Sequence, residues 1–158
     1  MNVLFVCTGN INRSAAGESI LNTYITKYNI SDIKVDSSGL NEESAKSRKI
    51  NNKTKTILKE KNLLFDENKR SNFSSKERVD WADVIIVMQP SHKKNLLSMY
   101  PHIENKIHFA IEYLDDCNLK NIPDPNFSKG TDEFYYVVYL MEKVVINFLK
   151  KNGYAIYN

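Results

Sequence analysis

Short apolar stretches alternate with longer amphipathic ones along this chain, and the two patterns predict strands and helices in turn. Strands are predicted where apolar and β-branched residues cluster, at residues 3–7, 33–37, 83–88 and 106–110. The stretch 83–88 is the most apolar, which favours a central strand that is covered on both faces.

Helices are predicted where apolar residues recur three or four positions apart. The clearest is the last helix, whose apolar face consists of Phe134, Val137, Val138, Met141, Val145, Phe148 and Leu149. Earlier helices are expected from Arg13 to about Tyr28, over 49–62 and over 90–100. The polar segments 40–47, 66–75 and 112–130 are expected to be loops, and residues 75–78 a turn.

Strands that alternate with helices predict an α/β fold, in which right-handed crossovers place helices on both faces of a parallel sheet. At 158 residues the chain is long enough to bury its own core, and we expect a single domain over residues 1–158. Ligands of such sheets bind at the carboxyl ends of the strands. Cys7 and Ser37 each stand at such an end, which predicts a site there.

The composition favours a globular protein without a membrane segment. Hydrophobic residues make up 42% of the chain, and no apolar run is long enough to span a membrane. The net charge is +3, but the lysines are scattered and mixed with acidic residues, so a solvated surface is favoured over nucleic-acid binding. The chain starts directly with a strand rather than a signal peptide, and its two cysteines are too few for a disulfide framework. We therefore expect a cytoplasmic protein.

The segment from Cys7 to Ser14 carries the clearest chemistry. A tight loop with Gly9 and Asn10, residues that tolerate unusual backbone angles, connects the first strand to the first helix. A loop that closes onto a helix N-terminus points backbone N–H groups into one concavity, which suits a tetrahedral oxyanion. Arg13 can bind two oxygens of that anion, and the same positive field, with the Ser14 hydroxyl, would stabilise a Cys7 thiolate. The alternative is a buried cysteine that ends a core strand beside a surface arginine.

The sequence Val-Cys-Thr-Gly-Asn-Ile-Asn-Arg-Ser at residues 6–14 resembles the phosphate loop of the low-molecular-weight protein tyrosine phosphatases, and the resemblance extends from residue 2 to about residue 151. It implies a three-layer fold with a four-stranded parallel sheet in the order 2-1-3-4 and the phosphate loop after strand 1. It also implies that Cys7 is the nucleophile. The residues implied to bind phosphate are Thr8, Gly9, Asn10, Ile11, Asn12 and Arg13, and those implied to support the loop are Asn10, Ser14 and Ser37. The chain departs from the pattern at Asn12, where many relatives have a second cysteine, and at Ala15, where many have proline.

A second motif, Pro123-Asp124-Pro125, lies upstream of the last helix. The two prolines restrict the backbone on both sides of Asp124, and a rigid, exposed carboxyl suits a general acid. Taken alone, Pro-Asp-Pro would more often be an ordinary turn. The phosphatase family has its Asp-Pro general acid at this position, so the resemblance implies that Asp124 protonates the leaving group.

The resemblance further implies a substrate slot with two walls. One wall is Asn126 and Phe127, with one aromatic residue where relatives often have two. The other wall falls at Leu40 and Asn41, on the loop after the second strand. This loop has acidic residues and no aromatic one. A phosphotyrosine protein is the leading substrate, a small phosphomonoester is the second, and inorganic phosphate is the product. We expect neither a cofactor nor a metal, since no His/Cys/Asp cluster has metal-ligand spacing. The sequence leaves the oligomeric state open.

Two other functions exist on the same fold. Arsenate reductases relay oxidation through two further cysteines, and this chain has only Cys117 besides Cys7. A non-catalytic phosphate-binding scaffold would usually have lost one of Cys7, Arg13 and Asp124. Because Asn12 replaces the second loop cysteine, we expect slow recovery of Cys7 from peroxide, and the role of Cys117 in redox protection stays open. Surface or loop positions are expected for the three histidines, His92, His102 and His108.

Overall fold

The computed structural model of the chain describes residues 1–115 and 118–157, so Cys117 lies outside the described residues. Four strands form one parallel sheet in the order β2-β1-β3-β4, which confirms the predicted topology. The strands are β1 (Asn2–Cys7), β2 (Lys34–Gly39), β3 (Val84–Val87) and β4 (Ile107–Phe109).

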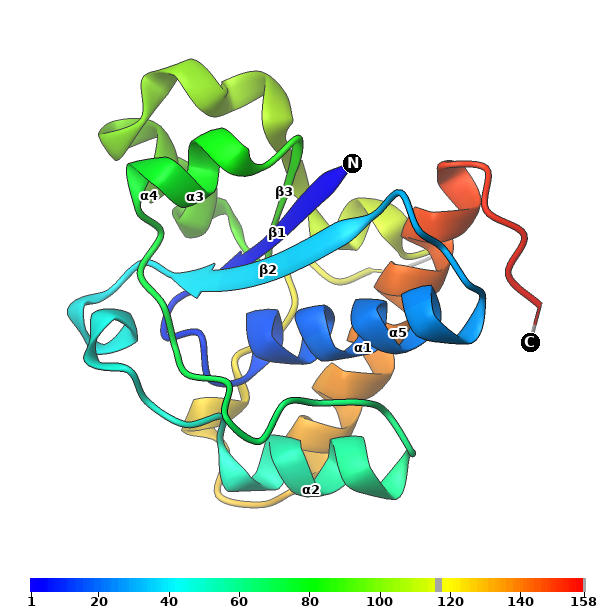
Figure 1. Cartoon of the computed structure of the whole chain (residues 1–158). Helices are drawn as coiled ribbons and strands as arrows, with labels where there is room; N and C mark the ends of the chain where they lie inside the picture. The colour runs from blue at the N-terminus through cyan, green and yellow to red at the C-terminus, as the bar shows by residue number, and fades with distance from the viewer. Residues whose placement is uncertain (116–117, 158) are drawn as a thin grey trace.

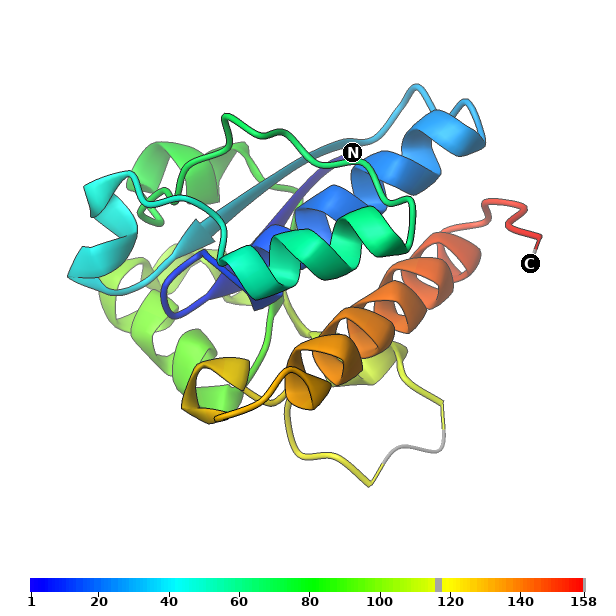
Figure 2. The same ribbon diagram turned by 90° about the horizontal axis from the view of Figure 1, so that it is seen from below.

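Helices cover both faces of the sheet and give the fold three layers. One face carries α1 (Arg13–Lys27), α2 (Asn52–Glu60) and α5 (Asp132–Lys151). The opposite face carries α3 (Lys76–Trp81) and α4 (Pro90–Met99). Figure 1 shows the sheet between these two layers. Figure 2, turned by 90°, shows α1, α2 and α5 packed together as one layer.

Side chains of β1 alternate between the two layers and connect both cores to the end of the strand. Phe5 and Cys7 face the core beneath α1, α2 and α5, whereas Leu4 and Val6 face the core beneath α3 and α4. Gly17 permits the close approach of α1, because a Cβ there would lie only 2.8 Å from the ring of Phe5. The strand β1 is therefore packed against a core on both faces up to its last residue, Cys7, at the edge of the sheet.

Two helices differ from the sequence-based expectation. Residues 75–78, expected to be a turn, open α3, because the Ser75 side chain caps the helix by accepting a hydrogen bond from the Arg78 N–H at 3.3 Å. The helix expected over 49–62 is shorter than predicted. The side chain of Asn51 caps its start, and Asn62, with a φ of 55°, follows its end.

Short 3₁₀ helices occupy parts of the expected loops and connections. They are η1 (Glu42–Lys46), η2 (Pro101–Lys106), η3 (Ala110–Tyr113) and η4 (Pro125–Phe127). In the part of the chain that the structure describes, no helix has the length and apolar character needed to cross a membrane.

Candidate active site

Cys7 ends β1, and its sulfur lies under the loop that leads to α1. The strand register pairs Cys7 with Gly39 of β2, so two strand ends meet at this edge. Cys7 Sγ lies 3.0 Å from Ser14 Oγ and accepts a hydrogen bond from the Asn10 N–H at 3.3 Å. Hydrogen-bond donors aimed at sulfur stabilise the thiolate form, which is the nucleophilic one.

One asparagine holds the phosphate loop, residues 7–14, in shape. Asn10 has left-handed backbone angles, with a φ of 57°. Its Nδ2 donates to Ser14 Oγ at 2.9 Å and to Ser37 Oγ at 2.8 Å, while its Oδ1 accepts from the Asn72 N–H at 2.8 Å. The structure thus joins Asn10, Ser14 and Ser37, the residues predicted to support the loop, by hydrogen bonds.

Gly39 allows β2 to end directly against this loop. A Cβ on Gly39 would lie 2.5 Å from the Cβ of Ser44, 2.8 Å from the carbonyl oxygen of Thr8 and 3.0 Å from the backbone nitrogen of Asn10. The last two contacts are with backbone of the phosphate loop, which can give way only if the loop changes shape. Gly9, by contrast, does not have a left-handed φ, and the unusual backbone angle expected in the loop is found at Asn10.

A partly buried ion pair, Glu18–Lys69, lies next to Ser37. The Ser37 hydroxyl donates to the Glu18 carboxylate, and Lys69 Nζ lies 2.8 Å from Glu18 Oε2. Burial raises the pKa of Glu18, and Lys69 opposes part of that rise. Because the Ser37 proton is directed to Glu18, the oxygen of Ser37 is free to accept from Asn10. The ion pair therefore fixes the polarity of the hydrogen bonds that lead to Cys7.

The Arg13 guanidinium is 2% exposed and is bonded through both terminal nitrogens. Nη1 donates to Gln89 Oε1 at 2.7 Å and to the carbonyl of Ile122 at 3.0 Å, and Nη2 donates to Asp124 Oδ2 at 3.2 Å. These acceptors hold the planar fork in one orientation. We did not predict Gln89 as a site residue; its place just beyond β3, at the carboxyl end of a strand, was the signal that could have identified it.

His92 is not a surface or loop residue, contrary to the sequence-based interpretation. It lies on α4 and is 2% exposed; its Nε2 is 3.0 Å from Thr8 Oγ1, and its Nδ1 accepts from the Met88 N–H at 3.3 Å. Because Nδ1 is an acceptor, the neutral ring carries its proton on Nε2 and donates to Thr8. Burial, and then the charge of Arg13, lower the pKa of His92 to about 3. The neutral ring therefore braces the loop at physiological pH.

Residues 122–127, which we name the acid loop, bring Asp124 to the phosphate loop. Asp124 caps η4, because its Oδ1 accepts a hydrogen bond from the Asn126 N–H at 3.0 Å. Its Oδ2 faces Arg13, as described above. The two loops share one cavity, whose lining residues are Cys7, Gly9, Ile11, Asn12, Arg13, Asp124 and Asn126. The structure thus brings together the predicted nucleophile, the predicted arginine and the predicted acid.

The other predicted wall residues lie at the edge of the site. Leu40, Asn41 and Phe127 are not among the residues that line this cavity. The N–H groups of Leu40 and Asn41 bond to the carbonyl of Thr8 at 2.9 and 3.1 Å, which holds their loop beside the phosphate loop. Phe127 is 89% exposed, directly after the acid. Their role as walls remains a prediction.

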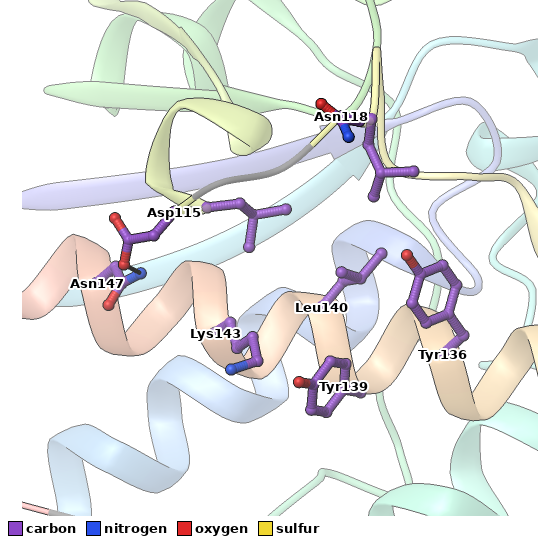
Figure 3. Close-up of a pocket in the computed structure, with 9 residues that line it drawn as sticks. Asp115, Asn118, Tyr136, Tyr139, Leu140, Lys143 and Asn147 are labelled. Carbon is purple, nitrogen blue, oxygen red and sulfur yellow. Dashed lines mark hydrogen bonds between the residues drawn. The ribbon is translucent and has the colours of Figure 1, made fainter.

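A cavity of about 510 Å³ lies elsewhere, between α5 and residues 114–115 and 118–119 (Figure 3). Tyr136, Lys143 and Asn147 contribute polar groups to it, and Asn147 Nδ2 donates to Asp115 Oδ2 at 3.2 Å. The cavity is larger than the hollow beside Cys7. We nevertheless place the active site at the smaller hollow, because a thiol, a guanidinium and a carboxyl converge there.

Comparison with known proteins agrees with this geometry. The sequence model of the family described as low molecular weight phosphotyrosine protein phosphatase matches residues 2–153. The chain belongs to this family. As a low molecular weight protein tyrosine phosphatase, it is a phosphoric monoester hydrolase whose substrate class is phosphotyrosine or another phosphomonoester.

Relatives cover nearly the whole phosphatase. The low molecular weight protein-tyrosine-phosphatase PtpA of Staphylococcus saprophyticus is 30% identical, over 97% of this chain and 96% of its own. A crystal structure of a protein tyrosine phosphatase from Entamoeba histolytica superposes with a TM-score of 0.86 at 24% identity and covers 96% of both chains. The YwlE arginine phosphatase from Geobacillus stearothermophilus superposes with a TM-score of 0.80 at 22% identity and covers 99% of both chains. At these identities the two structures show a shared fold.

Proposed function

We propose that this phosphatase hydrolyses phosphomonoesters through a phosphocysteine intermediate, with Cys7 as nucleophile, Arg13 as phosphate clamp and Asp124 as general acid and base. The observation that best supports the proposal is that these three side chains, from distant parts of the chain, line one cavity. The backbone N–H groups of residues 8–13 would complete the cradle for the equatorial oxygens.

In the first step, Cys7 Sγ attacks phosphorus in line with the leaving oxygen. The S–P bond forms as the P–O ester bond breaks, and Asp124 gives its proton to the departing alcohol or phenol. We assign that proton to Oδ2, because Oδ1 already accepts the Asn126 N–H. In the second step, the Asp124 carboxylate takes a proton from water, the resulting hydroxide attacks phosphorus, and the S–P bond breaks. Inorganic phosphate leaves and the thiolate is restored.

Arg13 can serve both steps without losing its anchor. Gln89 and the carbonyl of Ile122 hold Nη1. Nη2 can therefore exchange Asp124 for an equatorial oxygen of the substrate while the fork stays in its plane. The exchange would free Asp124 for the leaving group at the moment when its proton is needed.

We propose a phosphotyrosine protein as the substrate, with its ring between Phe127 on one side and Leu40 and Asn41 on the other. A small phosphomonoester is the second candidate. The exposure of Phe127 beside the acid supports the first. We propose that residues 1–158 act as one domain and that no cofactor is required. We also propose that the protein acts in the cytoplasm, where reducing conditions protect Cys7 from oxidation.

Hydrolysis of an aryl phosphate, with and without vanadate, tests the proposal. We expect Cys7→Ser to lower turnover by at least about 10⁴-fold, the scale seen when a catalytic nucleophile is removed, while the melting temperature changes little. Substantial activity in this variant would disprove the nucleophile. Phosphate binding without turnover in the wild type would instead favour the scaffold function.

Substrate choice is tested separately. Phosphotyrosine peptides, aliphatic phosphates and arginine phosphate are compared by kcat/KM; arginine phosphate is included because a relative of the same fold is named an arginine phosphatase. We expect the phosphotyrosine peptide to be the best substrate, since the exposed ring of Phe127 can stack on a phenyl ring. A strong preference for either of the others would overturn the phosphotyrosine proposal while leaving the phosphocysteine chemistry intact.

A further inference from the structure

Asn12 is a buried side chain for which the proposed chemistry has no use. It is 3% exposed and sits in the phosphate loop, where many relatives have a cysteine. A buried carboxamide, unlike a thiol, carries strong polar groups that need hydrogen-bond partners. Both groups have one: Nδ2 donates to Asn126 Oδ1 at 2.6 Å, and Oδ1 accepts from Thr54 Oγ1 at 2.9 Å. The first of these bonds crosses from the phosphate loop to the acid loop.

Asn126 is itself a departure from the family pattern, since relatives often have a second aromatic residue in this wall. Its side chain bonds to Asn12, and its backbone N–H bonds to Asp124 Oδ1. Asp124 Oδ2 pairs in turn with Arg13, the residue that follows Asn12 in the chain. Two asparagines that depart from the pattern therefore meet in one hydrogen bond, and the ring that they close contains the proposed acid.

Three side-chain hydrogen bonds join the described residues of the acid loop to the phosphate loop. They run from Arg13 to the carbonyl of Ile122, from Arg13 to Asp124, and from Asn12 to Asn126. The bond from Arg13 to Asp124 has to open in the proposed reaction, because Arg13 turns to the phosphate and Asp124 to the leaving oxygen. The other two can persist throughout, and of these only the Asn12–Asn126 bond holds an acid-loop residue that itself bonds to Asp124.

Thr54 contacts the side-chain amide of Asn12 on the side away from Asn126. It lies on α2, is 2% exposed, and donates its hydroxyl proton to Asn12 Oδ1. With Oδ1 occupied, the amide is held so that Nδ2 faces Asn126. In this orientation the Asn12 amide presents a donor to the acceptor on the acid loop, and both of its polar groups are hydrogen-bonded.

We propose that the Asn12–Asn126 hydrogen bond is a latch that positions the acid loop over the phosphate loop while Asp124 transfers its proton. The inference rests on the proposed role of Asp124 as general acid. Asn12 and Asn126 are positioning residues that act through Asp124, and Thr54 orients the first of them. The replacements of a cysteine at position 12 and of an aromatic residue at position 126 then form a single feature of this chain.

The latch is tested with aryl phosphates whose leaving groups span a wide range of pKa. For Asn12→Ala and Asn126→Ala we expect kcat to fall about three- to tenfold on poor leaving groups, the effect of one net hydrogen bond, and less than twofold on activated ones. Inhibition by vanadate should not change, because the side chains do not bind the phosphate. The double variant should lose no more than either single variant, since both remove the same bond.

Asn121→Ala serves as the matched control. Asn121 precedes the acid loop on the same segment, and its side chain has no hydrogen bond within the described residues, so its replacement should leave the leaving-group profile unchanged. Asn12→Cys, which restores the residue of many relatives, should behave like Asn12→Ala. Thr54→Val should show a smaller loss of the same kind. If Asn12→Ala fails to fold, Asn126→Ala, altered at an exposed position, tests the same bond.

The outcomes distinguish a failure of the latch from a failure of the proposed general-acid role of Asp124. If Asp124→Ala shows no dependence on the leaving group, the proposed acid is wrong and the latch is wrong with it. If Asp124→Ala does show that dependence while Asn126→Ala matches the wild type, only the latch is overturned. A loss that is equal for all leaving groups, or weaker inhibition by vanadate, would make Asn12 a structural part of the phosphate loop and would also overturn the latch.

Discussion

The phosphate loop is largely buried and is hydrogen-bonded to several elements, whereas the acid loop opposite it buries Ile122 and Pro125 but exposes its last two residues, Asn126 and Phe127. Five side chains of the first loop, Cys7, Asn10, Asn12, Arg13 and Ser14, are at most 3% exposed. The loop is hydrogen-bonded to β2 through Asn10, to α4 through Thr8 and to the segment after β3 through Arg13. In the acid loop, Asn126 is exposed and Phe127 is 89% exposed.

The difference in burial between the two loops follows from their proposed roles, which are to bind the phosphoryl group and to supply the general acid. Charge that develops on a transferring phosphoryl group is stabilised best by donors that are already in place, because their reorganisation would add to the barrier. A general acid has to reach leaving groups of different shapes and needs only one carboxyl in range. We therefore expect changes that disturb the packing or hydrogen bonds of the phosphate loop to lower both stability and activity, with the near-isosteric Cys7→Ser as the exception. Changes in the acid loop should lower activity alone.

The largest expected effect comes from Asp124→Ala. We predict a loss of about 10² to 10⁴ in kcat on poor leaving groups, as is typical when general acid catalysis is removed. The free energy of unfolding should change little, because the carboxyl is only partly buried and Arg13 keeps Gln89 and Ile122 as acceptors. Steady-state rates across a leaving-group series, together with urea unfolding, provide the measurement. An equal loss on every leaving group would show that Asp124 is not the acid.

A pair of glycine substitutions compares the surroundings of the two loops directly. At Gly39 a new Cβ would press on backbone atoms of Thr8 and Asn10, so Gly39→Ala should destabilise the fold by about 1–3 kcal/mol and lower kcat as well. At Gly130, between the acid loop and α5, a Cβ would have no neighbour within 4 Å. Gly130→Ala should therefore stay within about 0.5 kcal/mol of the wild type. If the two variants lost similar amounts of unfolding free energy, the proposed difference between the surroundings of the two loops would be wrong.

The same contrast explains which parts of the molecule the sequence could predict. The strand, loop and helix around Cys7 and the apolar face of α5 are local patterns, so both were recognised, and the strand order followed from the family resemblance. The turn expected at 75–78 is a helix because α3 is too short to show a period and is specified by its cap at Ser75. Periodicity carries little information about elements of that length.

The unpredicted site residues reach the loops through tertiary contact alone. Gln89, His92, Thr54 and Lys69 lie far from Cys7 in sequence, and apart from histidine they are residue types that are usually exposed. What makes them functional candidates is a polar partner at the site, together with burial for His92 and Thr54, and a single sequence displays neither. For Gln89 and His92 the carboxyl-end rule of parallel sheets was a usable signal, whereas for Thr54 and Lys69 no such rule applies.

The last prediction concerns only the pH dependence of stability and involves His92, which contacts the phosphate loop through Thr8. In the unfolded chain this ring takes up a proton as the pH falls below about 6.5, whereas in the folded protein its pKa of about 3 keeps it neutral. The unfolded state therefore binds more protons in this range. The contribution of His92 to stability is fully present above pH 6.5 and is lost as the pH falls toward 3.

His92→Gln separates this titration from the hydrogen bond, because glutamine can still donate to Thr8 but does not titrate. We expect the variant's free energy of unfolding to fall less steeply between pH 6.5 and 4, by up to about 1.4 kcal/mol per pH unit, the effect of one proton. Urea unfolding at several pH values measures how steeply the free energy of unfolding depends on pH. At pH 7.5, the difference in this free energy between variant and wild type reports the change in packing alone. Parallel slopes would show that the ring is protonated in the folded state, and the neutral Nε2–H donor assigned to it would be wrong.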